Sequence, residues 1–416
     1  MRMDATAIRS YVEQQCSKYE SKKLLPLMEP SFGPDEIMEA FDSMVNLQLT
    51  MGKKVRNFET LFSEYLSVKH STMVNSGSSA NLLAFSILAN PTIAGRICPG
   101  DEVIVPAVTW STSIFPIINV GAKPVLADVG EDYLLDTEKM KELITPKTKA
   151  IMAVHLLGNV CDMSAITDLA EDHGLFVVED TCEALGSEYG GKKAGNLSDI
   201  STFSFYFSHH ITTGEGGMLC TNDFNFADLS KILRAHGYVR DSLRKDEHIS
   251  ANPTIDPRFL FVNLGYNLRP MDIQAAFGIH QLAKLEGFVQ KRIATARALA
   301  SRLKRYEEYL ILPKEKPQTR HSWFVFPITV RENAPFNKSD LVRHLESHGI
   351  ETRPLVCGNF AEQPAISLFD FDKGDLRTSK FIMTNSFYFG VHPTITEEKL
   401  SKVVGAFESF FSQIKR

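Results

Sequence analysis

Short apolar runs alternate with amphipathic stretches along most of the chain. The runs have the length of buried strands and lie at 101–107, 124–129, 149–155 and 175–180. Helical patterns lie between them, for example at 136–143 and 164–173. Strands that alternate with helices in this way predict an α/β fold, in which crossover helices join the strands of a parallel sheet.

The two ends of the chain have their own patterns. A polar helical arm is predicted up to about residue 25, and a further helix begins at Pro34. A long helix over 284–308 has a one-sided apolar stripe and would connect to a smaller C-terminal domain. In that domain we expect a strand at 323–330 and helices at 340–348 and from about 397. The predicted division is an arm at 1–30, a large domain at 31–285 and a small domain at 286–416.

One stretch, 203–218 with the sequence FSFYFSHHITTGEGGM, is central to the interpretation. It opens with the alternation of a half-buried strand and closes in a run of glycines, where the chain must turn. Two adjacent histidines, His209 and His210, lie between these parts. A strand end that runs into a polar, glycine-rich loop is where folds place chemistry.

Two other strand ends carry polar residues. Val74 is followed by a Gly-Ser-Ser turn at Gly77 and then by an apolar helix, whose first N–H groups favour a phosphate. Taken alone, such a turn is most often a simple helix cap. The strand at 175–180 ends in Glu179 and Asp180, and ligands of open parallel sheets bind beyond the carboxyl ends of the strands.

Composition narrows the class of protein. The chain has 416 residues, of which 44% are hydrophobic and 23% charged, and its net charge is −5. These values indicate a globular protein with a sizeable core, and they favour neither a nucleic-acid nor a membrane partner. There is no run of 18 apolar residues and no apolar signal segment, so we expect a cytoplasmic protein.

The six cysteines are scattered, with no C-x-x-C pair. This spacing is typical of reduced thiols and not of a disulfide framework or a metal site.

The stretch 203–217 resembles the cofactor-anchoring segment of the DegT/DnrJ/EryC1/StrS sugar aminotransferases, which use pyridoxal 5′-phosphate (PLP). Their pattern is F-S-F-x-x-x-K-x-x-T-x-G-E-G-G, and every fixed position matches except the lysine, which is His209 here. That lysine carries the cofactor covalently, and an imidazole cannot. The replacement is similar to the PLP-dependent 3-dehydratases of nucleotide-linked 4-keto-6-deoxysugars.

The resemblance implies a fold and a cofactor site. The fold is that of PLP-dependent transferases of fold type I (aspartate aminotransferase-like), with a large mixed-sheet domain and a smaller C-terminal α+β domain. The implied cofactor-binding residues are Gly77, Ser78, Ser79, Trp110, Asp180, Ser204 and Asn267. Asp180 would pair with the pyridine nitrogen. Asn267 would reach the cofactor phosphate of a neighbouring subunit, which implies a homodimer with shared active sites.

The resemblance also implies a reaction. Glutamate would convert PLP to its amine form, PMP, and the sugar would then lose its C3 hydroxyl group, with release of ammonia. His209 would be the base. Glu183, which replaces a common glutamine, would assist proton transfer or direct a water, or it would be a solvated acid at a helix start. The implied substrate-binding residues are Arg353, Asn359 and His210, although Arg353 also fits a structural surface arginine.

No cysteine lies between Cys220 and Cys357, which argues against the iron–sulfur branch of the dehydratases. No metal site is expected. Two alternatives remain open at this stage: a sugar aminotransferase that makes an amino sugar, and an inactive PLP-fold protein that binds a sugar nucleotide.

Overall fold

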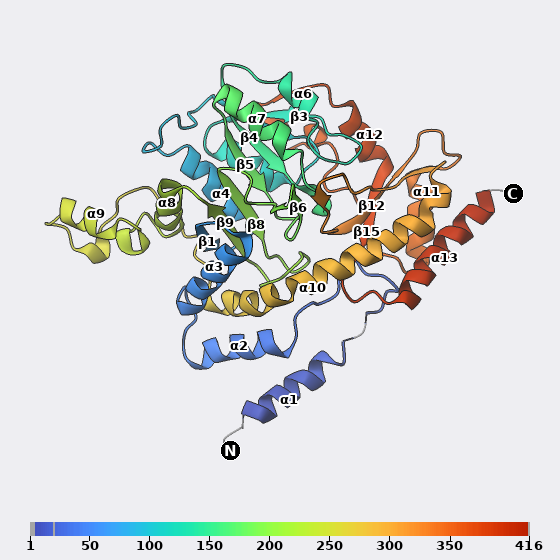
Figure 1. The fold of residues 1–416 in the computed structure, drawn as a ribbon, viewed down its shortest axis with the longest axis horizontal. Coiled ribbons are helices and arrows are strands. Elements are labelled where there is room, and N and C mark those ends of the chain that lie inside the picture. The colour runs from blue at the N-terminus through green and yellow to red at the C-terminus, as the bar shows by residue number, and fades with distance from the viewer. Residues whose placement is uncertain (1–4, 20, 415–416) are drawn as a thin grey trace.

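A large mixed sheet forms the centre of the computed structural model, which describes residues 5–19 and 21–414 (Figure 1). Its eight strands are, in spatial order, β1 (His70–Val74), β9 (Gly217–Thr221), β8 (Ile200–Ser204), β5 (Phe176–Asp180), β4 (Thr148–Val154), β2 (Glu102–Pro106), β3 (Lys123–Ala127) and β14 (Asp372–Lys373). Neighbours from β8 to β14 are parallel, as the sequence predicts. The strand β9 is antiparallel to both β1 and β8 and was not predicted.

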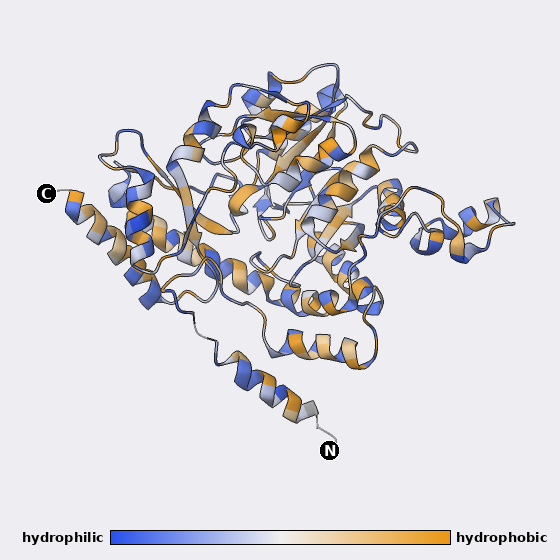
Figure 2. Ribbon diagram, turned by 180° about the vertical axis from the view of Figure 1, so that it is seen from behind, coloured by the Kyte–Doolittle hydropathy of each residue, from blue (hydrophilic) through white to orange (hydrophobic). Residues whose placement is uncertain are grey.

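Helices cover this sheet on both faces because the strands between them are buried on both sides. They are α4 (Gly77–Leu88), α5 (Phe115–Asn119), α6 (Thr137–Lys141), α7 (Met163–His173) and α8 (Phe224–Arg234), whereas α9 (Lys245–Ala251) projects away from the sheet (Figure 1). Every residue of β2 is buried. In Figure 2 the strands of the large sheet are mainly hydrophobic, whereas the surface helices alternate between polar and apolar residues.

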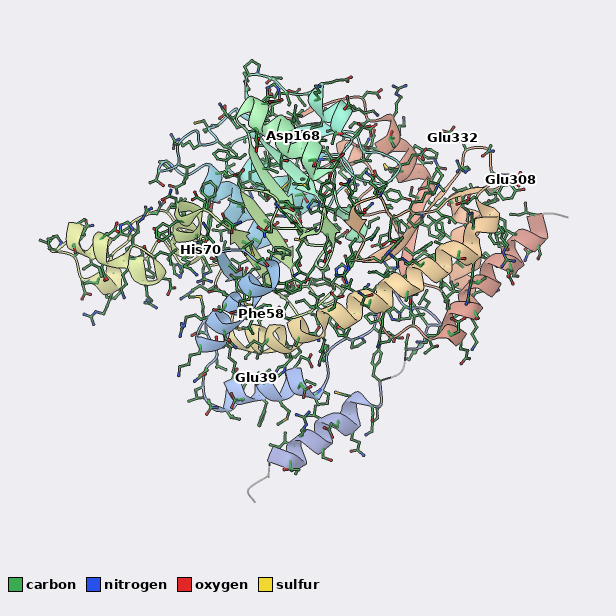
Figure 3. The ribbon with its side chains drawn as sticks, in the orientation of Figure 1. Glu39, Phe58, His70, Asp168, Glu308 and Glu332 are labelled. Atoms are coloured by element: carbon green, nitrogen blue, oxygen red, sulfur yellow. The ribbon has the colours of Figure 1, made fainter. Side chains whose placement is uncertain are left out.

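The longest helix, α10 (Asp272–Leu303), runs beneath the sheet and packs against α2 (Pro34–Val45) and α3 (Lys53–Leu66). It begins well before the predicted start near residue 284, and the boundary proposed at 285 lies inside it. Phe58 of α3 lies in the interior against α10, where a Cβ on Gly278 would come within 2.6 Å of its ring. Figure 3 shows Phe58 in this position, whereas the charged Asp168, Glu308 and Glu332 lie at the periphery.

The C-terminal part forms a second, antiparallel sheet. Its strands are, in spatial order, β10 (Leu310–Ile311), β12 (Val325–Val330), β15 (Ser386–Gly390) and β13 (Thr352–Pro354). The helices are α11 (Lys338–Ser347), α12 (Arg377–Asn385) and α13 (Glu397–Ile414). Phe326, Phe389 and Phe407 are fully buried between the sheet and α13. The predicted strand at 323–330 and the helices at 340–348 and from 397 are confirmed.

Two connections join the halves besides α10. The strand β14 comes from the C-terminal part but pairs with β3 of the large sheet. A small sheet of β11 (Thr319–Arg320), β6 (Glu188–Tyr189) and β7 (Lys192–Lys193) also combines both halves.

In the N-terminal arm, the helix α1 (Ala5–Cys16) ends before the predicted residue 25. Beyond it, Leu25 exchanges backbone hydrogen bonds with Gly349 and Glu351 of the C-terminal part. Within the described residues, no helix has both the length and the apolar character needed to cross a bilayer.

Candidate active site

A cavity of about 590 Å³ opens where the carboxyl ends of the large-sheet strands face the C-terminal part. Eight of the twelve site residues predicted from the sequence line it: Gly77, Ser78, Trp110, Asp180, Glu183, Ser204, His209 and Arg353. The other four, Ser79, His210, Asn267 and Asn359, do not. The parallel-strand rule therefore brings together most of the candidate residues, from segments far apart in the sequence.

The first turn of α4 forms one wall of the cavity. Ser76 precedes the helix, and its hydroxyl group accepts the N–H of Ser79 at 3.1 Å, so Ser79 serves the helix cap. A Cβ on Gly77 would lie 2.5 Å from Cβ of Ser204 and 3.1 Å from Sγ of Cys182, so only glycine fits there. The small residue keeps the N-terminal N–H groups of a 12-residue helix accessible beside two hydroxyl groups, which suits a phosphate.

Asp180 lies at the end of β5 with its carboxylate held by three donors. Oδ2 accepts the side-chain N–H of Asn81 at 2.9 Å and the hydroxyl group of Ser113 at 2.8 Å, and Oδ1 accepts the N–H of Cys182 at 3.1 Å. Three donors fix a carboxylate in one orientation. Asn81 was not identified from the sequence, because it lies in the apolar run of α4 and resembles a helix-core position there.

Trp110 lies at the rim of the cavity with 59% of its surface exposed. A large exposed indole beside a buried carboxylate can cover the face of a planar ring. These groups therefore fit PLP: a helix N-terminus for its phosphate, Asp180 for its ring nitrogen and Trp110 for one face.

His209 projects into the cavity from the loop after β8. Its Nδ1 lies 3.3 Å from the carbonyl oxygen of Ser204, which can only accept, so Nδ1 carries the proton and Nε2 keeps a free lone pair. Burial lowers the pKa of His209 to about 4, against the opposing charge of Asp180. The ring of Phe324 lies edge-on to the imidazole, with centroids 5.2 Å apart. His209 is thus an unprotonated base at neutral pH.

The adjacent His210 faces away from the cavity. It is buried, its Nε2 donates to the carbonyl oxygen of Ser322 at 3.3 Å, and its Nδ1 has no partner among the described residues. Burial holds the pKa of His210 well below its usual value. His210, a predicted substrate contact, therefore does not line the cavity. Its hydrogen bond to Ser322 supports the loop that carries His209.

Glu183 provides the second titratable group of the cavity. Its Oε2 accepts the N–H of Leu157 at 3.0 Å, and Leu157 takes a left-handed conformation with φ of 59°. Burial raises the pKa of Glu183 to about 7, and the charge of Asp180 adds to this effect. A carboxyl group with such a pKa can give or take a proton near neutral pH.

The C-terminal part supplies the opposite wall. Arg353 of β13 pairs with Glu351 at 2.9 Å and lies across the sheet from Tyr388 of β15. Burial raises the pKa of Tyr388 to about 12, so its hydroxyl group stays protonated as a donor. Asn359 is buried and accepts the N–H of Ala361, and so it shapes this wall without lining the cavity. Sequence reasoning missed Tyr388, because its strand carries no motif.

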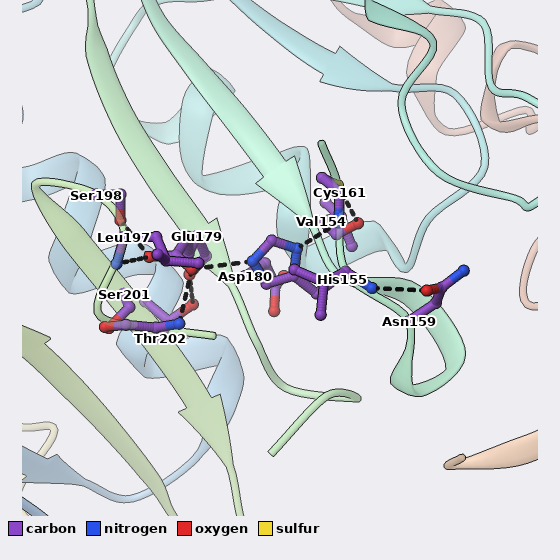
Figure 4. Close-up of polar contacts among 12 residues, drawn as sticks. Val154, His155, Asn159, Cys161, Glu179, Asp180, Leu197, Ser198, Ser201 and Thr202 are labelled. Atoms are coloured by element: carbon purple, nitrogen blue, oxygen red, sulfur yellow. Dashed lines mark hydrogen bonds and ion pairs between the residues drawn. The ribbon is translucent and has the colours of Figure 1, made fainter. Parts of the chain in front are cut away.

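A third missed residue, His155, lines the cavity behind Asp180 (Figure 4). Its Nδ1 accepts the N–H of Cys161 at 3.2 Å, so Nε2 carries the proton and donates to Glu179 at 3.0 Å. Glu179 also accepts from Gly195, Leu197 and Ser198. This network anchors the chain that leads into β8. The end of the strand at 149–155 was the signal that could have identified His155.

Asn267 lies in a separate surface hollow of about 310 Å³. Its Oδ1 accepts from Nε of Arg269 at 2.9 Å, and Arg56 and Arg240 line the same hollow. Asn267 is exposed, so its side chain can reach another molecule. No group of three or more potential metal ligands occurs in the described part of the chain.

Comparisons with known proteins agree with this geometry. A model of the DegT/DnrJ/EryC1/StrS aminotransferase family matches residues 31–408. GDP-4-keto-6-deoxy-D-mannose 3-dehydratase of Yersinia pseudotuberculosis is 39% identical over 360 residues, which cover 85% of this chain and 90% of that protein. dTDP-4-dehydro-2,6-dideoxy-D-glucose 3-dehydratase of Saccharopolyspora spinosa is 37% identical over 392 residues, which cover 91% of this chain and 85% of that protein.

A solved structure gives the same picture. It is a GDP-4-keto-6-deoxymannose-3-dehydratase with a trapped PLP–glutamate geminal diamine, and it matches with a TM-score of 0.87 and 31% identity. The match covers 92% of this chain and 99% of that one.

Proposed function

The chain belongs to the DegT/DnrJ/EryC1/StrS aminotransferase family, and within it we propose that the protein is a PLP-dependent 3-dehydratase of a nucleotide-linked 4-keto-6-deoxyhexose. The predicted fold type I architecture is confirmed by the mixed eight-stranded sheet and by the structural match. The observation that carries the proposal is His209, a neutral base at the position where the aminotransferases of this family have their cofactor-binding lysine.

The cofactor is held by noncovalent contacts alone, because residue 209 has no amine. The start of α4 with Gly77 and Ser78 would bind the phosphate, Asp180 would keep the ring nitrogen protonated, and Trp110 would cover one face. When bound, PLP in its amine form supplies an electron sink for the elimination. These contacts fix the ring without tethering it to the chain.

The chain's own residues move the protons. Nε2 of His209 takes a proton inside the cavity and can return it to the departing C3 hydroxyl group of the sugar. Glu183, with a pKa of about 7, lines the same cavity and can also transfer a proton. A lysine amine at residue 209 could return the proton to carbon and complete a transamination. Its replacement by His209 therefore favours elimination.

The substrate class follows from the relatives and from the wall formed by the C-terminal part. Both enzymes named above are 3-dehydratases, although one acts on a GDP-sugar and the other on a dTDP-sugar by their names. The common chemistry is a C4 ketone beside a C3 hydroxyl group. Arg353 and Tyr388 are suitable for contacts with the sugar nucleotide, and glutamate serves as the amino donor, in line with the PLP–glutamate adduct in the matching structure.

We also propose a homodimer in which Asn267 completes the phosphate site of the partner subunit. The support is the exposed position of Asn267, which lies in a basic hollow outside the cavity of its own chain. Exposed apolar side chains lie on the same segment, including Phe259 at 63% and Leu264 at 74% exposure. A nucleotide-sugar substrate and six unpaired cysteines suit the cytoplasm.

The proposal is tested by incubating purified protein with PLP, glutamate and either GDP- or dTDP-4-keto-6-deoxyhexose. Mass spectrometry should detect a sugar nucleotide that is lighter by one oxygen atom, together with free ammonia. A stable product that retains nitrogen would show an aminotransferase instead. No turnover of either sugar nucleotide, with PLP bound, would support a noncatalytic binding role.

A further inference from the structure

Arg292 of α10 is a buried arginine without an acidic partner. Only 4% of it is exposed, and its guanidinium group donates to the carbonyl oxygens of Phe324 at 2.8 Å, Trp323 at 3.2 Å and Val391 at 3.5 Å. None of the ion pairs in the described part of the chain includes Arg292, and its Nε has no partner there. Burial lowers the pKa of Arg292 to about 10, so the group stays charged at neutral pH. A buried charge without a counter-charge is costly.

This cation is linked to the two histidines through Phe324. Phe324, whose carbonyl oxygen binds Arg292, places its ring 5.2 Å from that of His209 and 5.8 Å from that of His210. His210 in turn donates to the carbonyl oxygen of Ser322, in the same segment. The guanidinium group therefore holds the backbone just before β12, and the Phe324 ring at this point contacts both imidazoles. Both imidazoles keep one unprotonated nitrogen.

We propose that Arg292 is a positioning residue of the dehydration site, which holds the His209 imidazole uncharged and keeps the Phe324 ring against it. The inference rests on the proposed function and adds a residue outside the cavity to it. Two properties of Arg292 act separately: its positive charge opposes a second proton on His209, and its hydrogen bonds fix the backbone of Trp323 and Phe324.

The surrounding charges are consistent with this role. The titratable and charged groups that share the cavity with His209 are His155, Asp180, Cys182, Glu183, Tyr206, Glu215, Arg353 and Tyr388. After burial, the charges that act on the pKa of His209 are Asp180, which raises it, and Arg292, which lowers it. Arg292 also lowers the pKa of His210 and of His392. The positive charge of Arg292 thus offsets the effect of the Asp180 carboxylate on the pKa of His209.

The test separates charge from support by comparing Arg292→Gln with Arg292→Lys. The protein is labelled with ¹³C at histidine Cε1 and titrated by NMR without substrate, and His209→Asn assigns the signal. Arg292→Gln should raise the pKa of His209 by about one unit, the scale on which a nearby charge acts. The acidic limb of the kcat profile should move by the same amount. Arg292→Lys should leave the titration unchanged while it lowers kcat.

The matched control is Arg297→Gln, which removes an exposed arginine of the same helix and should change neither titration nor kcat. An unchanged His209 titration in folded Arg292→Gln would overturn the proposal, and so would an equal rise in Arg292→Lys. If Arg292→Gln fails to fold, Arg292→Met, an uncharged side chain of similar length, is titrated in its place, and a His209 pKa equal to that of the wild type again contradicts the inference. The titration needs no turnover, so it can succeed even if the sugar screen fails.

Discussion

Two hollows of the molecule contain residues expected to bind the same cofactor, and they differ in kind. The cavity around His209 combines a base, the Asp180 carboxylate, and in Glu183 an acid with a pKa of about 7, all from residues 180–209 of the large-sheet half. The hollow around Asn267 has three arginines, Arg56, Arg240 and Arg269, with Asp241 as the acid in its lining. The hollow is therefore rich in arginine, whereas the cavity is lined by the single arginine Arg353 and by the N-terminus of α4. In the proposed homodimer, the hollow of one subunit would add positive charge to the phosphate site that the start of α4 forms in the other.

The largest effect is expected from His209→Asn, which removes the base from the cavity and leaves the anchoring groups intact. Loss of a general base costs about 10²–10⁴ in rate. Stopped-flow or steady-state kcat should therefore fall by this factor, while the affinity for PLP stays within a factor of about two of the wild type. A variant that binds PLP poorly would show that His209 belongs to the anchor and not to the chemistry.

His209→Lys converts the cavity to the aminotransferase pattern at the same position. We expect borohydride to fix the cofactor to the chain in this variant but not in the wild-type protein, as mass spectrometry of the intact chain can show. Dehydration should be lost. A pyridoxyl group fixed to the wild-type chain, or wild-type dehydration by the lysine variant, contradicts the mechanism.

Asp180→Asn should lower kcat by about 10²–10³, because an amide cannot hold the ring nitrogen protonated. The amide still fills the space between Asn81 and Ser113, so the melting temperature should change little. Ser113→Ala is the matched control, since it removes one donor to the carboxylate and keeps the charge. Near-normal turnover by Asp180→Asn would exclude Asp180 from the reaction.

A mixing experiment tests the hollow itself. Asn267→Ala should weaken PLP binding about tenfold, the cost of one hydrogen bond to a charged group. When inactive His209→Asn and Asn267→Ala subunits are exchanged in equal amounts, mixed dimers contain one intact site each. About a quarter of wild-type activity should then return at limiting PLP, because of two-fold symmetry. Activity that equals the mean of the two separate variants contradicts shared sites.

The smallest effect concerns stability. Glu183 has a raised pKa in the folded protein, so the folded state binds more protons than the unfolded state between pH 4.5 and about 7. Stability is therefore lost as the pH rises through this window. Glu183→Gln keeps an acceptor for the N–H of Leu157 without the charge, and it should gain about 2–3 kcal/mol relative to the wild type between pH 5 and pH 8. Urea unfolding at both pH values measures this difference, and a gain that does not change with pH disproves it.

The sequence predicted the elements whose pattern is local. Alternating apolar runs predicted the parallel strands, and the motif around His209 predicted the cavity, because strand ends share one edge of a sheet. The pattern could not predict β9, since Gly217 opens it and glycine normally interrupts a strand. Nor could it show that His209 and His210 face opposite ways, because that depends on the long-range contact with Ser322. The position of Asn267 relative to the cavity likewise depends on tertiary packing.

The strand β14 has a mechanical consequence. It joins the C-terminal part to the far edge of the large sheet, where Lys123 pairs with Asp372 at 2.6 Å and the N–H of Gly374 donates to the carbonyl oxygen of Leu126. Together with α10 and the small sheet of β11, β6 and β7, it connects the two halves at three separate places, so a simple hinge about one linker is blocked. We expect the halves to move as one rigid unit during turnover, and the sugar nucleotide to enter and leave through a mouth of nearly constant width.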